Sequence, residues 1–444
     1  MAAPAATGSA TPIDAILDRA PIGWFQIRVA LLCAFVAMLD GFDTQSVAFV
    51  APVLGQQWGI TPDRFGLIFS AGLVGIMVGQ VVLGPLSDRF GRRPVIIACT
   101  VAFGIGSFAT VLADNWIVLL LLRFLTGIGL GGATPNIIAL TAEVAPPRAR
   151  STMITTMFAG FPLGAAIGGY ISSHLIPAFG WESVFILGGA APLVLLFALL
   201  PWLSESPHHL LRREGRTERL ERLLDRMAGA DRESLPETPA PSANTAKAPG
   251  YGALFAGGLA GTTAQLWLAY FNSLLMIYFL MSWLPTVARE SGLALDTAII
   301  SAVFLNLGGA IGGIVLGRLA DRFGSFQTLA AGFAIAGISL VLIGFVGNQT
   351  ALLMTLAFIA GLFTIGGQTA MNAANAGLYP AEVRATALGG ALAVGRIGSI
   401  VGPTVGGLLL AANWPLSSIF IAVSLPALLT ALLAINLSRT TRRP

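Results

Sequence analysis

The sequence predicts an all-α integral membrane protein with twelve transmembrane helices in two pseudo-symmetric halves of six. Composition is the first indication, because 55% of the 444 residues are hydrophobic and only 10% are charged, a balance that soluble domains do not reach. The second is a series of twelve apolar segments of about 20 residues or more, the length at which a helix crosses a bilayer. The third is that features of the first half recur in the second.

The first apolar segment follows a short polar beginning. Residues 1–24 lack the basic stretch and small-residue cleavage site of a secretory signal, so we expect the first span to be retained. Continuous apolar runs of this length favour helices, since barrel strands are shorter and alternate. We predict spans at residues 25–51, 64–86, 94–113, 116–142, 151–175, 183–203, 262–287, 297–317, 326–346, 350–376, 385–411 and 416–437.

Basic residues gather on one side of these spans. Of the 25 Lys and Arg residues, Arg64 and Arg289 fall on the other side, and Arg123 and Arg396 fall deep within spans. Because basic loops stay in the cytoplasm, we expect both termini to be cytoplasmic in a multi-pass protein of a bacterial inner membrane.

One long polar stretch, Ser204 to Gly250, separates the sixth and seventh spans. Within it RREGRTERLERLLDRM predicts a charged amphipathic helix, and LPETPAPSANTAKAPG predicts a flexible linker. The expected divisions are a cytoplasmic segment 1–24, a six-helix half 25–203, a cytoplasmic linker 204–255, a second six-helix half 256–437 and a cytoplasmic tail 438–444.

The two halves repeat a loop motif. GPLSDRFGRR begins at Gly84 after the second span, and GRLADRFG begins at Gly317 after the eighth. Such repeats imply a pseudo-twofold axis along the membrane normal, with a site between the halves near the midplane. The charged side chains of the motif can pair across the cytoplasmic face or serve only as anchors. The candidate gate residues here are Gly84, Asp88, Arg89, Gly91, Arg92, Asp321 and Arg322.

The motif GPLSDRFGRRP and its weaker copy resemble the signature of the major facilitator superfamily between its second and third helices. LDGFDTQ in the first span resembles the Asp-Gly-x-Asp signature of the aromatic acid:proton symporters. RFLTGIGLGG, YFLMSWLPT and YPAEVRATALGGALAVGRIGSIVGP extend the resemblance over essentially the whole chain. It implies a proton-coupled secondary transporter that imports benzoates, hydroxybenzoates or protocatechuate by alternating access. It also implies roles for Asp40, Asp43, Arg123, Glu143 and Arg396.

Two carboxylates, Asp40 and Asp43, lie near the middle of the first span. Each ionised carboxylate in hydrocarbon costs at least about 2.5 kcal/mol on insertion scales, so the pair indicates a function. Residues three apart share a helix face, and Gly41 between them allows close approach of a helix or ligand. We therefore expect these acids to couple transport to protons.

Arg123 in the fourth span matches Asp43 in depth, because each lies about eight residues from the outer end of its span, or roughly 12 Å deep. We expect the two to meet. Protonation of Asp43, or of Asp40, would then free Arg123 to hold a substrate anion. The alternative is a permanent structural ion pair. That alternative predicts that Asp43→Asn lowers the amount of folded protein, whereas coupling predicts folded protein whose uptake no longer depends on external pH.

Arg396 lies near the midplane of the opposite half, where it can bind the same anion or pair with a backbone carbonyl. Glu143, at the cytoplasmic end of the fourth span beside Arg148 and Arg150, is expected to form a gate ion pair with these loop arginines. Ring stacking and hydroxyl recognition suggest further substrate-binding residues, although packing and interhelical hydrogen bonds explain them as well. These are Tyr270, Asn272, Tyr278, Asn306, Gln368 and Asn372.

Several function classes are disfavoured. The three histidines lack metal spacing and no GxxxxGK[ST] motif is present, so we expect no metal, no cofactor and no ATP-driven mechanism. No nucleophile or acid–base pair indicates an enzyme, and the basic loops reflect topology rather than nucleic-acid binding. The expected partners are a small aromatic carboxylate, protons and the lipid bilayer, with the protein a monomer.

Other functions stay open. The protein could export rather than import, or carry a drug or another small organic anion, such as a muconate-like diacid or a sugar acid. Exporters of the superfamily tend to have a glycine-proline pair in the fifth span, whereas Gly164 is followed here by Ala165. A membrane sensor that binds the acid without transport is a further alternative, but the linker shows no effector domain.

Overall fold

The computed structural model describes residues 22–214, 217–228, 251–256, 259–376, 378–379 and 383–440, and within these ranges it contains helices and turns but no strand. Twelve segments of this part are long and apolar enough to cross a membrane. The predicted fold class is therefore confirmed.

The six spans of the N-terminal half lie close to their predicted positions. They are α2 (Trp24–Trp58), α3 (Pro62–Phe90), α4 (Arg92–Thr110), α5 (Trp116–Val144), α6 (Arg150–Phe158) with α7 (Gly160–Phe179), and α8 (Glu182–Trp202). The fifth span is thus two helices rather than one. Pro162 explains the break, because it has no N–H to donate to the carbonyl of Phe158 one turn earlier.

The C-terminal half begins with a short 3₁₀ helix, η2 (Tyr251–Phe255). Its six spans are α11 (Ala260–Glu290), α12 (Leu295–Phe323), α13 (Ser325–Ile343), α14 (Thr350–Ala376), α15 (Arg384–Ala411) and α16 (Leu416–Thr440). Helices such as α12 continue past the apolar run that predicted them, because helical hydrogen bonding does not stop where polar residues begin.

The linker forms two helices, α9 (Pro207–Glu214) and α10 (Glu218–Ala228), where sequence reasoning expected one. Leucines of α10 pack in one apolar cluster with Phe25 and Val29 of α2, and Gln26 Nε2 donates to the carbonyl of Met227 at 3.1 Å. The predicted flexible stretch 235–250 lies outside the described residues. We call the end of the bundle that carries α9 and α10 the linker end, and the opposite end the distal end.

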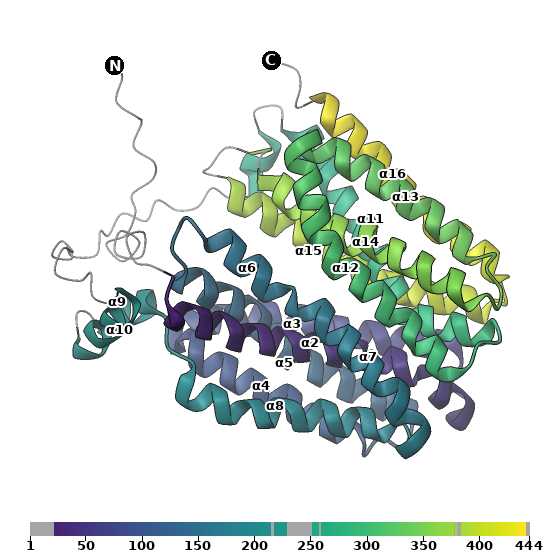
Figure 1. The fold of residues 1–444 in the computed structure, drawn as a ribbon, viewed down its shortest axis with the longest axis horizontal. Coiled ribbons are helices and arrows are strands. Elements are labelled where there is room, and N and C mark those ends of the chain that lie inside the picture. Colours follow the sequence, from purple (N-terminus) through teal and green to yellow (C-terminus); the bar gives the residue numbers. More distant parts are fainter. Residues whose placement is uncertain are drawn as a thin grey trace.

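Helix packing is repeated between the halves, which lie side by side in Figure 1. In the N-terminal half α2 packs on α7, α3 on α5, and α4 on α8. In the C-terminal half α11 packs on α15, α12 on α14, and α13 on α16, which are the equivalent pairs. The halves meet where α3 packs on α15 and α7 on α12, and these two contacts exchange under a pseudo-twofold axis.

The contacts between the halves lie toward the distal end. Ser70 Oγ, near the distal start of α3, donates to the carbonyl of Ile400 on α15 at 2.7 Å. The rings of Phe69 and Trp283 meet edge to face with centroids 5.4 Å apart. The N-terminal half is thus joined to the C-terminal half on the distal side of the bundle centre.

Candidate functional site

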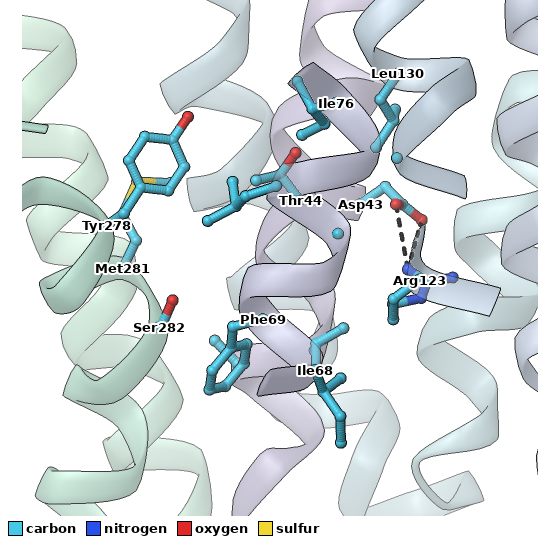
Figure 2. A pocket seen from close by; sticks show the side chains of 15 residues that line it. Asp43, Thr44, Ile68, Phe69, Ile76, Arg123, Leu130, Tyr278, Met281 and Ser282 are labelled. Carbon is cyan, nitrogen blue, oxygen red and sulfur yellow. Dashed lines mark hydrogen bonds and ion pairs between the residues drawn. The ribbon is translucent and has the colours of Figure 1, made fainter. Parts of the chain in front are cut away.

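A cavity with about 530 Å³ of empty space, continuous with solvent, lies between the two halves. Its walls come from α2, α3 and α5 on one side and from α11 on the other, as Figure 2 shows. It is lined by Asp43, Thr44, Val47, Ala48, Ile68, Phe69, Gly72, Leu73, Ile76, Arg123, Gly127, Leu130, Tyr278, Met281 and Ser282.

Asp43 and Arg123 form an ion pair at the edge of this cavity (Figure 2), with Nη1 of Arg123 3.3 Å from Oδ2 of Asp43. The two residues come from α2 and α5 and are brought together at the matching depths that the sequence indicated. Both side chains are nearly sealed from solvent, at 3% exposed for Asp43 and 4% for Arg123. Removing one partner of such a buried pair lowers the stability of the protein, because the other charge is left uncompensated.

Further groups hold the pair in place. Ser107 Oγ on α4 donates to Oδ1 of Asp43 at 2.7 Å. Nη2 of Arg123 donates to the hydroxyls of Thr110 and Thr126, and the guanidinium lies 4.9 Å from the ring centroid of Phe185. Both terminal nitrogens of Arg123 are therefore engaged within the N-terminal half.

Asp40 is held differently. Its carboxylate accepts hydrogen bonds from Thr44 Oγ1 at 3.1 Å and from Thr134 Oγ1 at 2.9 Å, and the residue is 5% exposed. The nearby charges that act on it are Arg396 of the C-terminal half, which attracts it, and Asp43, which repels it. Asp40 does not line the cavity itself, but Thr44 does. Asp40 is thus connected to the cavity by its hydrogen bond with Thr44.

Arg396 on α15 lies across from these acids. Its Nη1 donates to the hydroxyl of Tyr278 at 3.1 Å, and Tyr278 forms the wall of the cavity opposite Asp43 and Arg123 (Figure 2). Arg396 is partly exposed. Among the described residues it forms no ion pair, in contrast to Arg123.

The other predicted substrate-binding residues do not line this cavity. Tyr270 donates to Oδ1 of Asn372 at 2.9 Å, and Gln368 donates to the same oxygen at 3.2 Å, so these three form a separate polar cluster between α11 and α14. Asn306 donates to Oε1 of Gln45 at 2.9 Å. The cluster and the Asn306 bond show the interhelical hydrogen bonding that was the alternative interpretation of these residues.

Asn272 is the remaining predicted substrate-binding residue. It is buried at 6% exposed, and its Nδ2 has no hydrogen-bond partner among the described residues.

The first loop motif forms a charged network at the linker end. Arg92 contacts Asp88 at 2.8 Å and Glu143 at 3.4 Å, and it also donates to Ser87. The observed partner of Glu143 is thus Arg92, where sequence reasoning named Arg148 and Arg150. Gly84 lies beside Pro135, and Arg89 is exposed over the ring of Phe90.

Glu205 completes this network and was missed from sequence. Its Oε1 accepts from the backbone N–H groups of Arg92 at 2.8 Å and Arg93 at 3.2 Å, so the carboxylate caps the positive N-terminus of α4. Gly91 makes this possible, since its φ of 104° suits glycine and a Cβ there would overlap the Glu205 carboxylate. The available signal was an acid directly after the sixth span, ahead of Pro207.

The second copy of the motif is less enclosed. Asp321 and Arg322 are exposed near the end of α12, and Arg322 lies 5.2 Å from the ring centroid of Phe323. Gly324 ends the helix with a φ of 94°, as Gly91 does in the first copy.

Sequence reasoning also missed the hydroxyls that position the charges, such as Thr126 and Thr134. Their spacing carried a signal, since Thr126 follows Arg123 by one helical turn and Thr134 follows by three turns, on the same face. Among the described residues no group of three or more His, Cys, Asp or Glu side chains is arranged to hold a metal ion.

Comparisons with known proteins agree with this geometry. A family model described as Major Facilitator Superfamily matches residues 33–307 and 266–444. The chain is 38% identical to the 4-hydroxybenzoate transporter PcaK of Pseudomonas aeruginosa, over 94% of this chain and 93% of that protein. It is also 38% identical to the gallate transporter of Pseudomonas putida, over 95% and 94%. In fold it is similar to a bacterial homologue of the human lysosomal transporter Spinster, with a TM-score of 0.73 at 17% identity, covering 95% of this chain and 98% of that one.

Proposed function

The chain belongs to the major facilitator superfamily, in the branch of the aromatic acid transporters, and from this premise we propose that it imports aromatic carboxylates together with protons. The substrates are of the hydroxybenzoate, benzoate or protocatechuate type. Such a protein is a secondary transporter and not an enzyme, because it moves its substrate without changing it.

The observation that carries the proposal is the cavity between the halves. It joins apolar walls that suit an aromatic ring to charged and hydroxyl groups, namely the ion pair of Asp43 and Arg123 on one side and Tyr278, which Arg396 contacts, on the other. A site between two pseudo-symmetric halves is where alternating access requires it. Protonation of Asp40 or Asp43 would offset the charge of the incoming anion and couple the two movements.

Topology supports the direction. If the basic linker end is cytoplasmic, both termini lie in the cytoplasm of a bacterial cell and the spans lie in its inner membrane. We further propose that the protein acts as a monomer. The halves are joined toward the distal end, so the structure then corresponds to an inward-facing state. Substrate would leave toward the linker end and enter when the distal contacts separate. Glu143, Arg92 and the other motif residues would belong to the gate at the linker end.

The test is uptake by the purified protein in proteoliposomes. Labelled 4-hydroxybenzoate should accumulate when an inward proton gradient is imposed and should only equilibrate without one. Labelled muconate, assayed in parallel, separates a preference for aromatic acids from a general preference for organic anions. If neither compound shows gradient-stimulated uptake, proton-coupled import is wrong. If an outward gradient drives the movement instead, the protein is an exporter, and binding without any movement would identify a sensor.

A further inference from the structure

We infer that the carboxylate of the substrate binds Arg396 and Tyr278 rather than Arg123, and that Asp40, not Asp43, is the acid that takes up the coupled proton. This inference rests on the proposed function and assigns its two central steps to particular residues. From sequence, Arg123 was expected to hold the anion after protonation of Asp43 or of Asp40, so the inference changes the arginine and chooses between the two acids.

Arg123 is unsuited to receive a further anion because its charge is already neutralised. Asp43 lies 3.3 Å from Nη1, the hydroxyls of Thr110 and Thr126 bind Nη2, and Phe185 covers the guanidinium. The remaining donor, Nε, has no partner among the described residues and is buried, so a ligand in the cavity does not reach it. A substrate carboxylate would first have to displace Asp43, which would leave that acid buried without its partner.

Arg396 is suited to the task because, within the described part of the chain, only its Nη1 has a partner, the hydroxyl of Tyr278 at 3.1 Å. Its other N–H groups are not buried, and the residue is partly exposed. Since the Tyr278 oxygen accepts from Arg396, its own proton is available to donate to a ligand in the cavity that this residue lines. A guanidinium and a phenol hydroxyl together provide separate donors for the two oxygens of a carboxylate.

The total charge in the middle of the spans explains why a proton must accompany the anion. Among the described residues, the charged side chains at least seven residues from either end of their helices are Asp40, Asp43, Arg123 and Arg396, and their charges sum to zero. One bound carboxylate makes the sum negative in a low-dielectric site, and one proton restores neutrality. The expected stoichiometry is therefore one proton for each monovalent anion.

Asp40 is the acid whose charge depends on Arg396. Asp43 is paired with Arg123, whereas Asp40 has hydroxyl partners and the attraction of Arg396. When a carboxylate binds Arg396, that attraction is cancelled, and Asp40 then faces both Asp43 and the substrate as like charges. Protonation of Asp40 removes both repulsions.

No other charge competes at this site in the part of the chain that the structure describes. The remaining charged residues of the spans packed against α2, which are α3, α5, α6, α7, α8 and α11, lie within six residues of a helix end, and α10 lies at the linker end. The other titratable side chains on α2 and these helices are Cys33, Tyr170, His174, Tyr270 and Tyr278, and His174 is exposed near the distal end of α7.

The experiment is equilibrium binding of labelled benzoate to detergent-purified protein, with benzamide, the neutral analogue, as competitor. Arg396→Gln should weaken benzoate binding by about tenfold or more and remove the preference for benzoate over benzamide. Tyr278→Phe, which keeps the ring, should weaken it by about three- to tenfold, while Tyr170→Phe on the exposed face of α7 is the matched control. Arg123→Gln should keep the preference for benzoate over benzamide. If the Arg123→Gln protein does not fold, the double variant D43N/R123Q is used for the same measurement.

The pH profile of benzoate binding tests the acid, over a range in which benzoate itself stays ionised. Affinity of the wild type should rise as pH falls, because protonated Asp40 favours the anion. Asp40→Asn should make the affinity independent of pH, and Asp43→Asn should keep the dependence. The reverse pattern, or loss of the benzoate preference in Arg123→Gln alone, would overturn the assignment. Transport remains a separate outcome, since a wild type that binds benzoate but shows no gradient-driven uptake contradicts the proposed function and not the binding assignment.

Discussion

The two halves of the molecule share one helix arrangement but differ in their chemistry. Equivalent helices pack in equivalent pairs in both, so the scaffold is repeated. The N-terminal half carries three buried charges, Asp40, Asp43 and Arg123, each bonded to side chains of its own half. In the C-terminal half, the part that the structure describes has one central charge, Arg396, and otherwise uses neutral groups such as the Tyr270 and Asn372 cluster. A duplicated scaffold can therefore keep its packing while its two copies take on different charges.

Replacing the central arginine of each half should give the largest difference in stability between the two halves. Arg123→Gln leaves Asp43 buried without its countercharge, and we expect it to lower the free energy of unfolding by about 3–5 kcal/mol. Arg396→Gln removes a partly exposed charge with one hydroxyl partner, so its effect on stability should be about 1 kcal/mol or less. Thermal unfolding of the purified variants in detergent measures both.

The control is D43N/R123Q, which removes both charges of the pair together. It should recover most of the stability lost in Arg123→Gln, because no uncompensated charge remains. Equal losses for Arg123→Gln and Arg396→Gln would contradict the difference between the halves.

Close helix contacts provide the opposite case, in which the halves should respond alike. A Cβ on Gly131 of α5 would overlap the carbonyl of Ile76 on α3, and one on Gly361 of α14 would overlap the carbonyl of Leu305 on α12. Each Gly→Ala change should therefore lower the free energy of unfolding by about 1–3 kcal/mol.

Gly389 on α15 is the matched control for these two changes, since a Cβ there would meet nothing within 4 Å. Gly389→Ala should be neutral or slightly stabilising, because alanine favours the helix. Thermal unfolding in the same detergent compares the three variants. A large loss at only one of Gly131 and Gly361 would show that the scaffold is not equivalent in the two halves.

Helix positions could be predicted closely from sequence because bilayer thickness imposes a minimum length on every apolar run. The meeting of Asp43 with Arg123 could be predicted as well, since depth along two spans is a matter of counting residues. The position of a side chain in the membrane plane, relative to the neighbouring helices, cannot be counted in this way. Because of this position, Tyr278 lines the cavity while Tyr270, two turns away on the same helix, binds Asn372 instead. The choice between Asp40 and Asp43 likewise depends on hydroxyl partners from other helices, whose contacts no single span shows.

Substitutions at the two loop motifs should give the smallest difference in stability between the two halves. Glu205 accepts two backbone N–H groups at the start of α4, whereas Asp321 in the second copy is exposed. Glu205→Gln keeps the shape but removes the charge, so it should lower the free energy of unfolding by about 1–2 kcal/mol. Asp321→Asn should change it by less than about 0.5 kcal/mol. Thermal unfolding of wild type, Glu205→Gln and Asp321→Asn in the same detergent compares the two copies. Equal losses for Glu205→Gln and Asp321→Asn would show that the carboxylate at the start of α4 gives the first copy no extra stability, which would contradict the difference between the two copies.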